Sequence, residues 1–454
     1  MNNVIDFINT SKDRFLEELK QYLAIPSVSS LPEHRDDMRR CAEWTAGQLR
    51  DIGLQNVRLA ETAGHPIVYG EWLGAPGAPT MLIYGHYDVQ PVDPIDQWTT
   101  PPFEATVRDG DLYARGAADD KGQVFMHLKA LQAHMSQTGR LPVNVKVMIE
   151  GEEEVGSEHL DDFIRAEKER LRCDVVVVSD TAMFARGVPS ICYGLRGLVY
   201  AQIDLRGTKT DLHSGSFGGA VANPALVLAQ VLAQMKDRSG RIKIPGFYDD
   251  VRPLTEQERQ EFKRLPFDEK QYRKELGAPR LFGEKDYSTL ERTWGRPTFD
   301  VNGLLSGFTG EGSKTVIPAT AMAKVSMRLV PNQDPDKIAM LFEEYVRTVT
   351  PKTVDLKVTR MHGGKPWMTD LDNRFVQAAS RAIEQGFGKR AVYTREGGSI
   401  PIVSTFQEEL NAPSVLFGIG LPDENSHAPN EFLNLENLYG GILASAFLYR
   451  ELAQ

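Results

Sequence analysis

Several short apolar runs in this sequence lead into side chains that can bind metal ions. The run MLIY leads into Gly85-His86-Tyr87-Asp88, VKVMIE into Gly151-Glu152-Glu153-Glu154, VVVVS into Asp180, and VLFGIG through a loop into His427. A further candidate is Asp119, just before a predicted helix. A single His or Asp at a strand end is more often a structural hydrogen-bonding residue, so the prediction rests on their joint occurrence.

These residue types suit hydrolysis at a pair of metal ions. Two histidines and three carboxylates can hold two divalent ions about 3.5 to 4 Å apart when one carboxylate bridges them, which is the geometry of metal-assisted hydrolysis. Nitrogen and oxygen ligands without thiolates favour zinc, with manganese or cobalt as alternatives. The sequence therefore predicts a hydrolase with two divalent ions, Zn²⁺ in the first instance.

The strands that must position these residues are predicted by apolar runs. They span Met81 to Tyr84, Val143 to Ile149, Val175 to Val178, and Val415 to Ile419, and each is typical of a buried parallel strand. Helical stretches separate them, which favours an α/β fold. In open α/β sheets ligands bind beyond the carboxyl ends of the strands, so the candidate ligands are expected to converge on one crevice.

The segment from Asp120 to His134 is predicted to form an amphipathic helix. Val124, Leu128 and Leu131 recur on one helical face, and the acidic residues at the start of the segment suit a helix N-terminus. Asp119 would then lie in the loop that enters this helix.

The chain is too long for one simple core, and its character changes between residues 198 and 362. Within this span a charged, proline-punctuated stretch from residue 241 to 296 lies between the strand-like pieces YAQIDLRG and AKVSMRLVP. We predict a catalytic domain formed by residues 1–197 and 363–454, with a mostly parallel sheet and helices on both faces. Residues 198–362 are predicted to form an inserted α+β domain.

Composition limits the partners. Acidic residues outnumber basic ones by 62 to 52, and the net charge of -10 repels phosphate backbones and anionic lipid, so neither nucleic acid nor a membrane is expected as a partner. No apolar run reaches the roughly 18 residues of a membrane span. Cys41, Cys173 and Cys192 have no paired spacing, so no disulfide framework is predicted. A soluble cytoplasmic protein is expected.

Motifs along the chain occur in the order in which one metallopeptidase family carries them. They are GHYDVQP (85–91), ARGAADDKGQ (114–123), EGEEEVGSEHL (150–160), DLHSGSFGG (211–219), GSKTVIPA (312–319), REGGSIP (395–401) and HAPNE (427–431). The sequence resembles the aminoacylase and carboxypeptidase G-type metallopeptidases, and within them the carnosinase-like cytosolic dipeptidases, over nearly its whole length. The resemblance implies a homodimer in which residues 198–362 form a lid and dimerisation domain.

The resemblance also implies how two metal ions would be held. His86, Asp119 and Asp180 would bind one ion, and Asp119, Glu154 and His427 would bind the other, so that Asp119 bridges the pair. The peptide bond that follows Asp119 is implied to be cis.

Two further carboxylates are implied to act beside the metal ligands. Glu153 corresponds to the family's general base, which takes a proton from the metal-bridging water and passes it to the leaving amine. Asp88 corresponds to the residue that orients His86 by accepting its second ring proton. Because Glu153 and Glu154 are neighbours, a non-helical turn is expected to point one at the substrate and the other at the metal.

Substrate binding is assigned to residues distant in sequence from the metal ligands. Arg328 offers a planar guanidinium for a free C-terminal carboxylate, and Ser399 follows a Gly-Gly pair that allows close backbone approach. Thr315 is a further candidate for substrate binding. The resemblance implies that His213 of one subunit reaches the active site of the other and stabilises the oxyanion on the substrate carbonyl. The expected substrate is a dipeptide or similarly small molecule with a carboxylate.

Two alternatives remain at this point. An N-acyl amino acid deacylase would need the same metal ligands and the same free carboxylate, although the stretch around IPGFYDDVRPLT resembles the dipeptidase branch more closely. A non-catalytic binding protein on the same scaffold would be expected to lack a ligand or the general base, and all of these residues are present.

Overall fold

In the computed structural model, which describes residues 1–398 and 400–454, the chain divides into two units. The first contains Met1–Tyr193, Thr369–Thr394 and Ile402–Gln454, and the second contains Gly194–Met368 and Arg395–Pro401. The boundaries predicted from the sequence were at residues 197/198 and 362/363, and the short segment Arg395–Pro401 was predicted to belong to the catalytic domain. This segment joins the second unit because the Arg196 N–H donates to the Gly398 carbonyl and the Arg395 guanidinium donates to Glu258.

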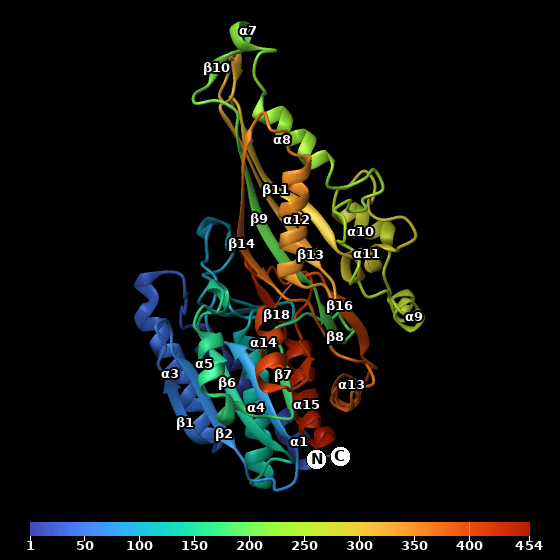
Figure 1. The fold of residues 1–454 in the computed structure, drawn as a ribbon. Helices are drawn as coiled ribbons and strands as arrows, with labels where there is room; N and C mark the ends of the chain where they lie inside the picture. The colour runs from blue at the N-terminus through green and yellow to red at the C-terminus, as the bar shows by residue number, and fades with distance from the viewer. Residues whose placement is uncertain (399) are drawn as a thin grey trace. The chain divides into compact units, whose positions relative to one another are not determined.

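The first unit is built on a sheet whose centre is parallel. Its strands are β1 (Gln55–Ala60), β2 (Ile67–Trp72), β3 (Thr80–His86), β6 (Asn144–Glu150), β7 (Val175–Val178), β17 (Ser414–Leu416) and β8 (Ser190–Leu195). They follow the order β1-β2-β6-β3-β7-β17-β8, with β6, β3, β7 and β17 paired in parallel and the pairs at either end antiparallel. Figure 1 shows β1, β2 and β6 side by side. β16 (Val392–Glu396) also pairs with β8. The predicted α/β fold is confirmed.

Helices cover both faces of this sheet. One face carries α1 (Asn2–Thr10), α2 (Lys12–Leu23), α3 (Arg35–Ile52), α4 (Lys121–Thr138), α13 (Arg374–Phe387) and α15 (Leu435–Leu452), and the other carries α5 (Leu160–Ala166), α6 (Lys168–Leu171) and α14 (Pro401–Leu410). Alternate residues of β3 serve the two faces: Met81 and Ile83 join the core of the first helical layer, whereas the Tyr84 ring lies 5.1 Å from that of Phe406 in α14. The continuous apolar runs in the sequence are explained by this double burial.

α4 is buried on almost every side, so the predicted amphipathic stripe is wrong for this helix. It packs against β3 and also against α1, α2, α3 and α15. Even Lys129 is buried, and its ammonium group donates to Glu18 and Gln48. A helix enclosed between a sheet and a second layer of helices has no face that must be polar.

The second unit contains an antiparallel sheet with the order β11-β13-β9-β14. The strands of this sheet are β9 (Gly197–Arg206), β11 (Thr298–Ser306), β13 (Thr320–Leu329) and β14 (Asp355–Gly364). Two short strands, β10 (Leu212–His213) and β12 (Val316–Ile317), pair with each other, and β15 (Trp367–Met368) pairs with the end of β8. Its helices are α7 (Ser214–Phe217), α8 (Pro224–Ala233), α9 (Glu256–Arg264), α10 (Glu269–Glu275), α11 (Thr289–Gly295) and α12 (Pro335–Val349). Alternate residues of β9 and β13 are buried in a core that α8 and α12 complete, which gives the α+β architecture.

A third, small sheet in the first unit joins distant parts of the chain. β5 (Asp111–Tyr113) pairs with β4 (Thr106–Arg108) on one side and with β18 (Phe432–Asn434) on the other. This pairing brings the segment after His427 beside the loop that precedes α4. Among the residues that the structure describes, no helix is long and apolar enough to cross a membrane.

Candidate metal centre

The candidate metal ligands lie where the parallel strands end. β3 ends at His86, β7 is followed by Asp180, and Glu154 lies in a turn just after β6. His427 lies in the loop between β17 and β18 and has a positive φ of 64°, a conformation that His adopts more readily than most residues. Asp119 lies in the loop that enters α4, and its peptide bond to the next residue is cis.

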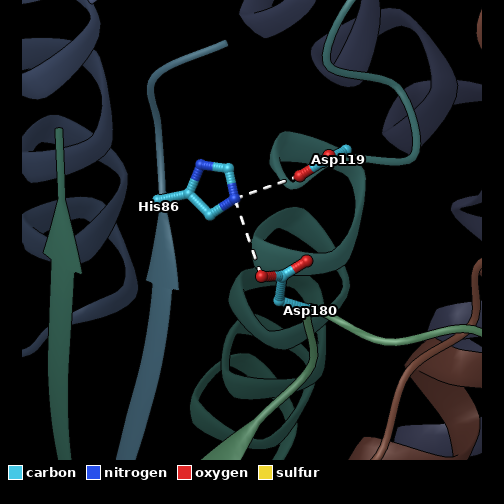
Figure 2. Close-up of side chains that lie close together, drawn as sticks. All are labelled: His86, Asp119 and Asp180. Atoms are coloured by element: carbon cyan, nitrogen blue, oxygen red, sulfur yellow. Dashed lines mark hydrogen bonds and ion pairs between the residues drawn. The ribbon is translucent and has the colours of Figure 1, made fainter. Parts of the chain in front are cut away.

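The first group of ligands is gathered around His86 (Figure 2). Its Nε2 atom lies 3.1 Å from Asp119 Oδ1 and 4.0 Å from Asp180 Oδ2. The other ring nitrogen, Nδ1, faces Asp88, so Nε2 is the atom directed at the two carboxylates. Ligand atoms of one tetrahedral zinc ion lie about 3.3 Å apart, and the ligand atoms of these three side chains all lie within 4.8 Å of one another.

The second group shares Asp119 with the first. His427 Nε2 lies 2.9 Å from Asp119 Oδ2 and 3.2 Å from Glu154 Oε2. Each oxygen of Asp119 therefore belongs to a different group, and within each group the ligand atoms lie within 4.8 Å of one another. Two imidazoles and three carboxylates in this arrangement fit two divalent ions bridged by one carboxylate.

The electrostatics of the cluster also suit cations. Burial and the neighbouring Asp119 charge raise the pKa of Asp180 well above its usual value. Burial raises the pKa of Glu153 to about 8, with a contribution from the Glu154 charge and an opposing one from His86. Hydrogen bonds to Asp119 and Glu154 raise the pKa of His427 to about 10. Crowded carboxylates of this kind are stabilised in their charged form by a bound metal ion.

Asp88 lies beside the second ring nitrogen of His86 and also contacts the turn that carries the two glutamates. The closest acceptor to His86 Nδ1 is the Asp88 backbone carbonyl at 3.1 Å, and the carboxylate oxygen Oδ1 lies at 3.4 Å. The carboxylate also accepts hydrogen bonds from the backbone N–H groups of Glu153 and Glu154, at 3.3 and 3.1 Å. The buried Asp88 side chain thus holds the turn that carries both acids.

That turn is helical, contrary to the prediction. Residues Glu153–Val155 form one turn of 3₁₀-helix. With three residues per turn, successive side chains diverge by about 120°, so neighbouring glutamates still point in different directions. Glu154 faces His427, whereas Glu153 belongs to neither group of candidate ligands among the described residues.

Gln90 contacts the candidate ligand Glu154, and this contact was not predicted from the sequence. Its Nε2 atom donates to Glu154 Oε2 at 2.8 Å and to the Glu154 carbonyl at 3.3 Å. It belongs to the GHYDVQP motif, but a glutamine after a strand has no spacing that distinguishes a ligand partner from a turn residue.

The residues assigned to the substrate lie in the second unit and fall into two places. His213 and Thr315 lie together, because β10 pairs with β12 and the Ser214 N–H donates to the Thr315 carbonyl. Arg328 lies near the other end of β13, eight residues beyond Thr320 where that strand begins. The predicted residue Ser399 lies outside the described residues; its neighbours, Gly397 and Gly398, accept hydrogen bonds from Arg196.

A parallel sheet edge with two groups of ligands that share one aspartate defines a hydrolase of the two-metal class. The profile of peptidase family M20/M25/M40 matches residues 82–450, and the chain belongs to this family. The family expected from the motifs is thereby confirmed.

Relatives match along the whole chain. The Cys-Gly metallodipeptidase dug1 of Schizosaccharomyces pombe is 34% identical, with 100% of this chain and 98% of that protein aligned. The human Beta-Ala-His dipeptidase is also 34% identical, with 100% and 93% aligned. Among solved structures, the M20 metallo-carboxypeptidase Sso-CP2 from Sulfolobus solfataricus has a TM-score of 0.84 at 34% identity and covers 97% of this chain and 99% of its own. The protein is therefore an enzyme of the metallopeptidase class.

Proposed function

We propose that this enzyme hydrolyses the amide bond of dipeptides that have a free C-terminal carboxylate. The observation that carries the proposal is the division of the two Asp119 oxygens between two groups of ligands, because this arrangement serves paired metal ions. The dipeptidase names of relatives aligned over the full length support the substrate class. We propose the cytoplasm as the compartment and Zn²⁺ as the metal, with Mn²⁺ or Co²⁺ as alternatives.

The chemistry can be divided between the ions and the protein. Bound divalent ions would polarise the amide carbonyl and make water acidic enough to attack at neutral pH. Glu153 takes a proton from the attacking water, whose oxygen bonds to the carbonyl carbon. The same proton is then delivered to the amide nitrogen as the C–N bond breaks, which releases an amine and a carboxylic acid. Burial and neighbouring charge raise the pKa of Glu153, which suits both steps.

Carboxylate recognition is assigned to Arg328, with Ser399 and Thr315 as further substrate contacts. Arg328 lies on the sheet face that α8 and α12 do not cover and is half-buried, which strengthens its interaction with an anion. Arg196 is its neighbour: it lies two residues before Leu198, the residue that pairs with Arg328, so both point to one face. The second guanidinium adds positive charge at this end of the sheet.

A homodimer with His213 acting across subunits is also proposed. Thr320 and Arg328 are separated by roughly 26 Å along β13, and His213 lies beyond the Thr320 end. An extended dipeptide spans only about 7 Å. His213 and Arg328 of one chain therefore cannot touch the same substrate, whereas residues from two chains can.

The edge strand of the same unit supports dimerisation. β11 is an outer strand of its sheet, and Val301, Leu304 and Leu305 on it are exposed. An exposed apolar edge strand is a typical surface for pairing with another chain. We propose that a second copy of this chain covers it.

Activity against a panel of substrates tests the function. Metal-free protein is reconstituted separately with Zn²⁺, Mn²⁺ and Co²⁺ and assayed with dipeptides and with N-acetyl amino acids. We expect hydrolysis of dipeptides to be faster by kcat/KM. A preference for N-acetyl amino acids would favour the deacylase. Protein that binds no divalent ion and has no activity would favour the non-catalytic alternative.

A further inference from the structure

Glu431 ends the HAPNE motif and makes a set of buried contacts that the proposed reaction does not explain. Its side chain is fully buried. Oε2 accepts hydrogen bonds from Arg115 Nη1 at 2.7 Å and from the Gly116 N–H at 2.9 Å. Oε1 accepts from the Ala118 N–H at 2.9 Å and from the Asp119 N–H at 3.1 Å. One carboxylate therefore binds most of the loop that ends at the shared ligand Asp119.

This loop needs an acceptor from outside. It is neither strand nor helix, and Gly116 has a left-handed φ of 82°. The N–H groups of Gly116, Ala118 and Asp119 therefore take part in no β-ladder or helical hydrogen bonds and donate to Glu431. A buried N–H group without a hydrogen-bond partner destabilises the folded protein, because it loses its bond to water and gains none in return. Glu431 reaches the loop because β18 pairs with β5, and the Glu431 carbonyl accepts from the Ala114 N–H.

The contacts require a charged carboxylate. Both carboxylate oxygens of Glu431 face only hydrogen-bond donors. An ionised carboxylate can accept hydrogen bonds at both of its oxygens, whereas a protonated one would have to donate at one of them. Arg115 supplies the compensating charge: it is 1% exposed, its Nη2 donates to the Pro91 carbonyl at 3.1 Å, and it lies over the Trp98 ring. A glutamine at position 431 would place its NH₂ group, a hydrogen-bond donor, next to a backbone N–H group, which is also a donor.

We propose that Glu431 is a positioning residue of the metal centre, which fixes the backbone at Asp119 so that one carboxylate oxygen serves each group of ligands. The proposal rests on the two-metal site described above. A residue needed only for folding would not change the metal affinity of the folded protein, whereas the proposed role makes that affinity depend on Glu431. It also makes both metal sites depend on it, since Asp119 belongs to both.

Metal titration of the Glu431→Gln variant tests the proposal. Metal-free protein is titrated with Zn²⁺ by calorimetry in competition with a chelator, and with Co²⁺ by visible absorption, which reports ligand geometry. Loss of a residue that orients a ligand typically weakens binding about 10- to 100-fold, and we expect a loss of this size at both sites. Unchanged affinities, or a loss at one site only, would overturn the proposal.

Gln90→Met is the matched comparison. Gln90 contacts Glu154, which belongs to only one group of ligands, so this variant should weaken one site and spare the other. Glu284→Gln controls for loss of a buried ion pair, because Glu284 binds Arg296 in the second unit at 2.8 Å. It should lower the melting temperature and leave both metal affinities unchanged.

Two further results complete the test. If Glu431→Gln does not fold, Glu431→Asp keeps the charge but is too short to reach both pairs of donors, and wild-type affinity in that variant would equally overturn the proposal. If the unaltered protein itself binds no divalent ion, the proposed function fails. Normal binding by the unaltered protein together with normal binding by the variants would reject the role of Glu431 alone.

Discussion

At the scale of single residues, the centre is organised by backbone contacts as much as by ligand atoms. Asp88 holds the backbone of the turn that carries Glu153 and Glu154, and Glu431 holds the backbone that carries Asp119. The ligand types and their positions after strands could be predicted from the sequence, because metal ligands belong to a small set of residue types. The hydrogen bonds that orient these ligands could not be predicted, since a buried carboxylate that accepts from backbone N–H groups produces no recognisable sequence pattern.

Glu153 and Glu154 are neighbours with different predicted roles. Glu153→Gln should lower kcat by orders of magnitude and leave two metal ions bound, because the amide keeps the shape of the side chain but cannot accept a proton. Glu154→Ala should lower the metal content, measured by atomic absorption after dialysis. Glu152→Gln is the matched control, since Glu152 pairs with His159 instead of a ligand. Near-normal turnover by metal-loaded Glu153→Gln would refute the assignment.

Arg328 should select substrates by their C-terminal charge. Amidation of a dipeptide removes the carboxylate and a charge-assisted bond worth roughly 1.5 to 3 kcal/mol, so kcat/KM should fall roughly 10- to 100-fold. In Arg328→Met the free acid should become as poor a substrate as the amide. Lys324→Met is the control, because Lys324 lies on the same face of β13. Equal rates for acid and amide in the wild-type enzyme would exclude carboxylate recognition.

At the scale of elements, the least predictable feature was how completely α4 is enclosed. The period of its apolar residues indicates a helix, and the helix is there. The polar residues between them suggested a solvent-exposed face. However, Lys129 donates hydrogen bonds to Glu18 and Gln48, and His127 Nε2 lies 2.7 Å from Ser179 Oγ. Partners from other elements decide whether a polar residue can be buried, and a single helix does not contain that information.

His127 should make the stability of the first unit depend on pH. Burial lowers its pKa to about 3, so it stays neutral in the folded protein while the unfolded chain takes up a proton below about pH 6.5. Stability is therefore lost as pH falls below that value, by about 1 kcal/mol between pH 7 and 5.5. Urea unfolding of metal-free His127→Gln should show a smaller loss over this range. An identical pH dependence in both proteins would contradict the effect.

At the scale of the whole molecule, the two units divide the predicted site residues. All candidate metal ligands and Glu153 belong to the first unit, whereas His213, Thr315 and Arg328 belong to the second. The change in sequence character near residue 198 predicted an insertion, because a charged stretch with prolines rarely continues a buried parallel sheet. The short segment Arg395–Pro401 could not be assigned in advance, since it joins the second unit through contacts with Arg196 and Glu258, which are distant from it in the sequence.

Subunit mixing tests whether His213 acts in the partner's site. His213→Ala and Glu153→Ala should each be inactive alone. If His213 acts across subunits, a mixed dimer has one site in which Glu153 of one chain meets His213 of the other, and one site that lacks both. With random exchange half of the dimers are mixed, so roughly a quarter of wild-type activity should return. If His213 acted within its own chain, neither site of the mixed dimer would be complete. Mixed dimers verified by differential tags but without activity would therefore refute the trans role, and the separation of His213 from Arg328 along β13 would then need another explanation.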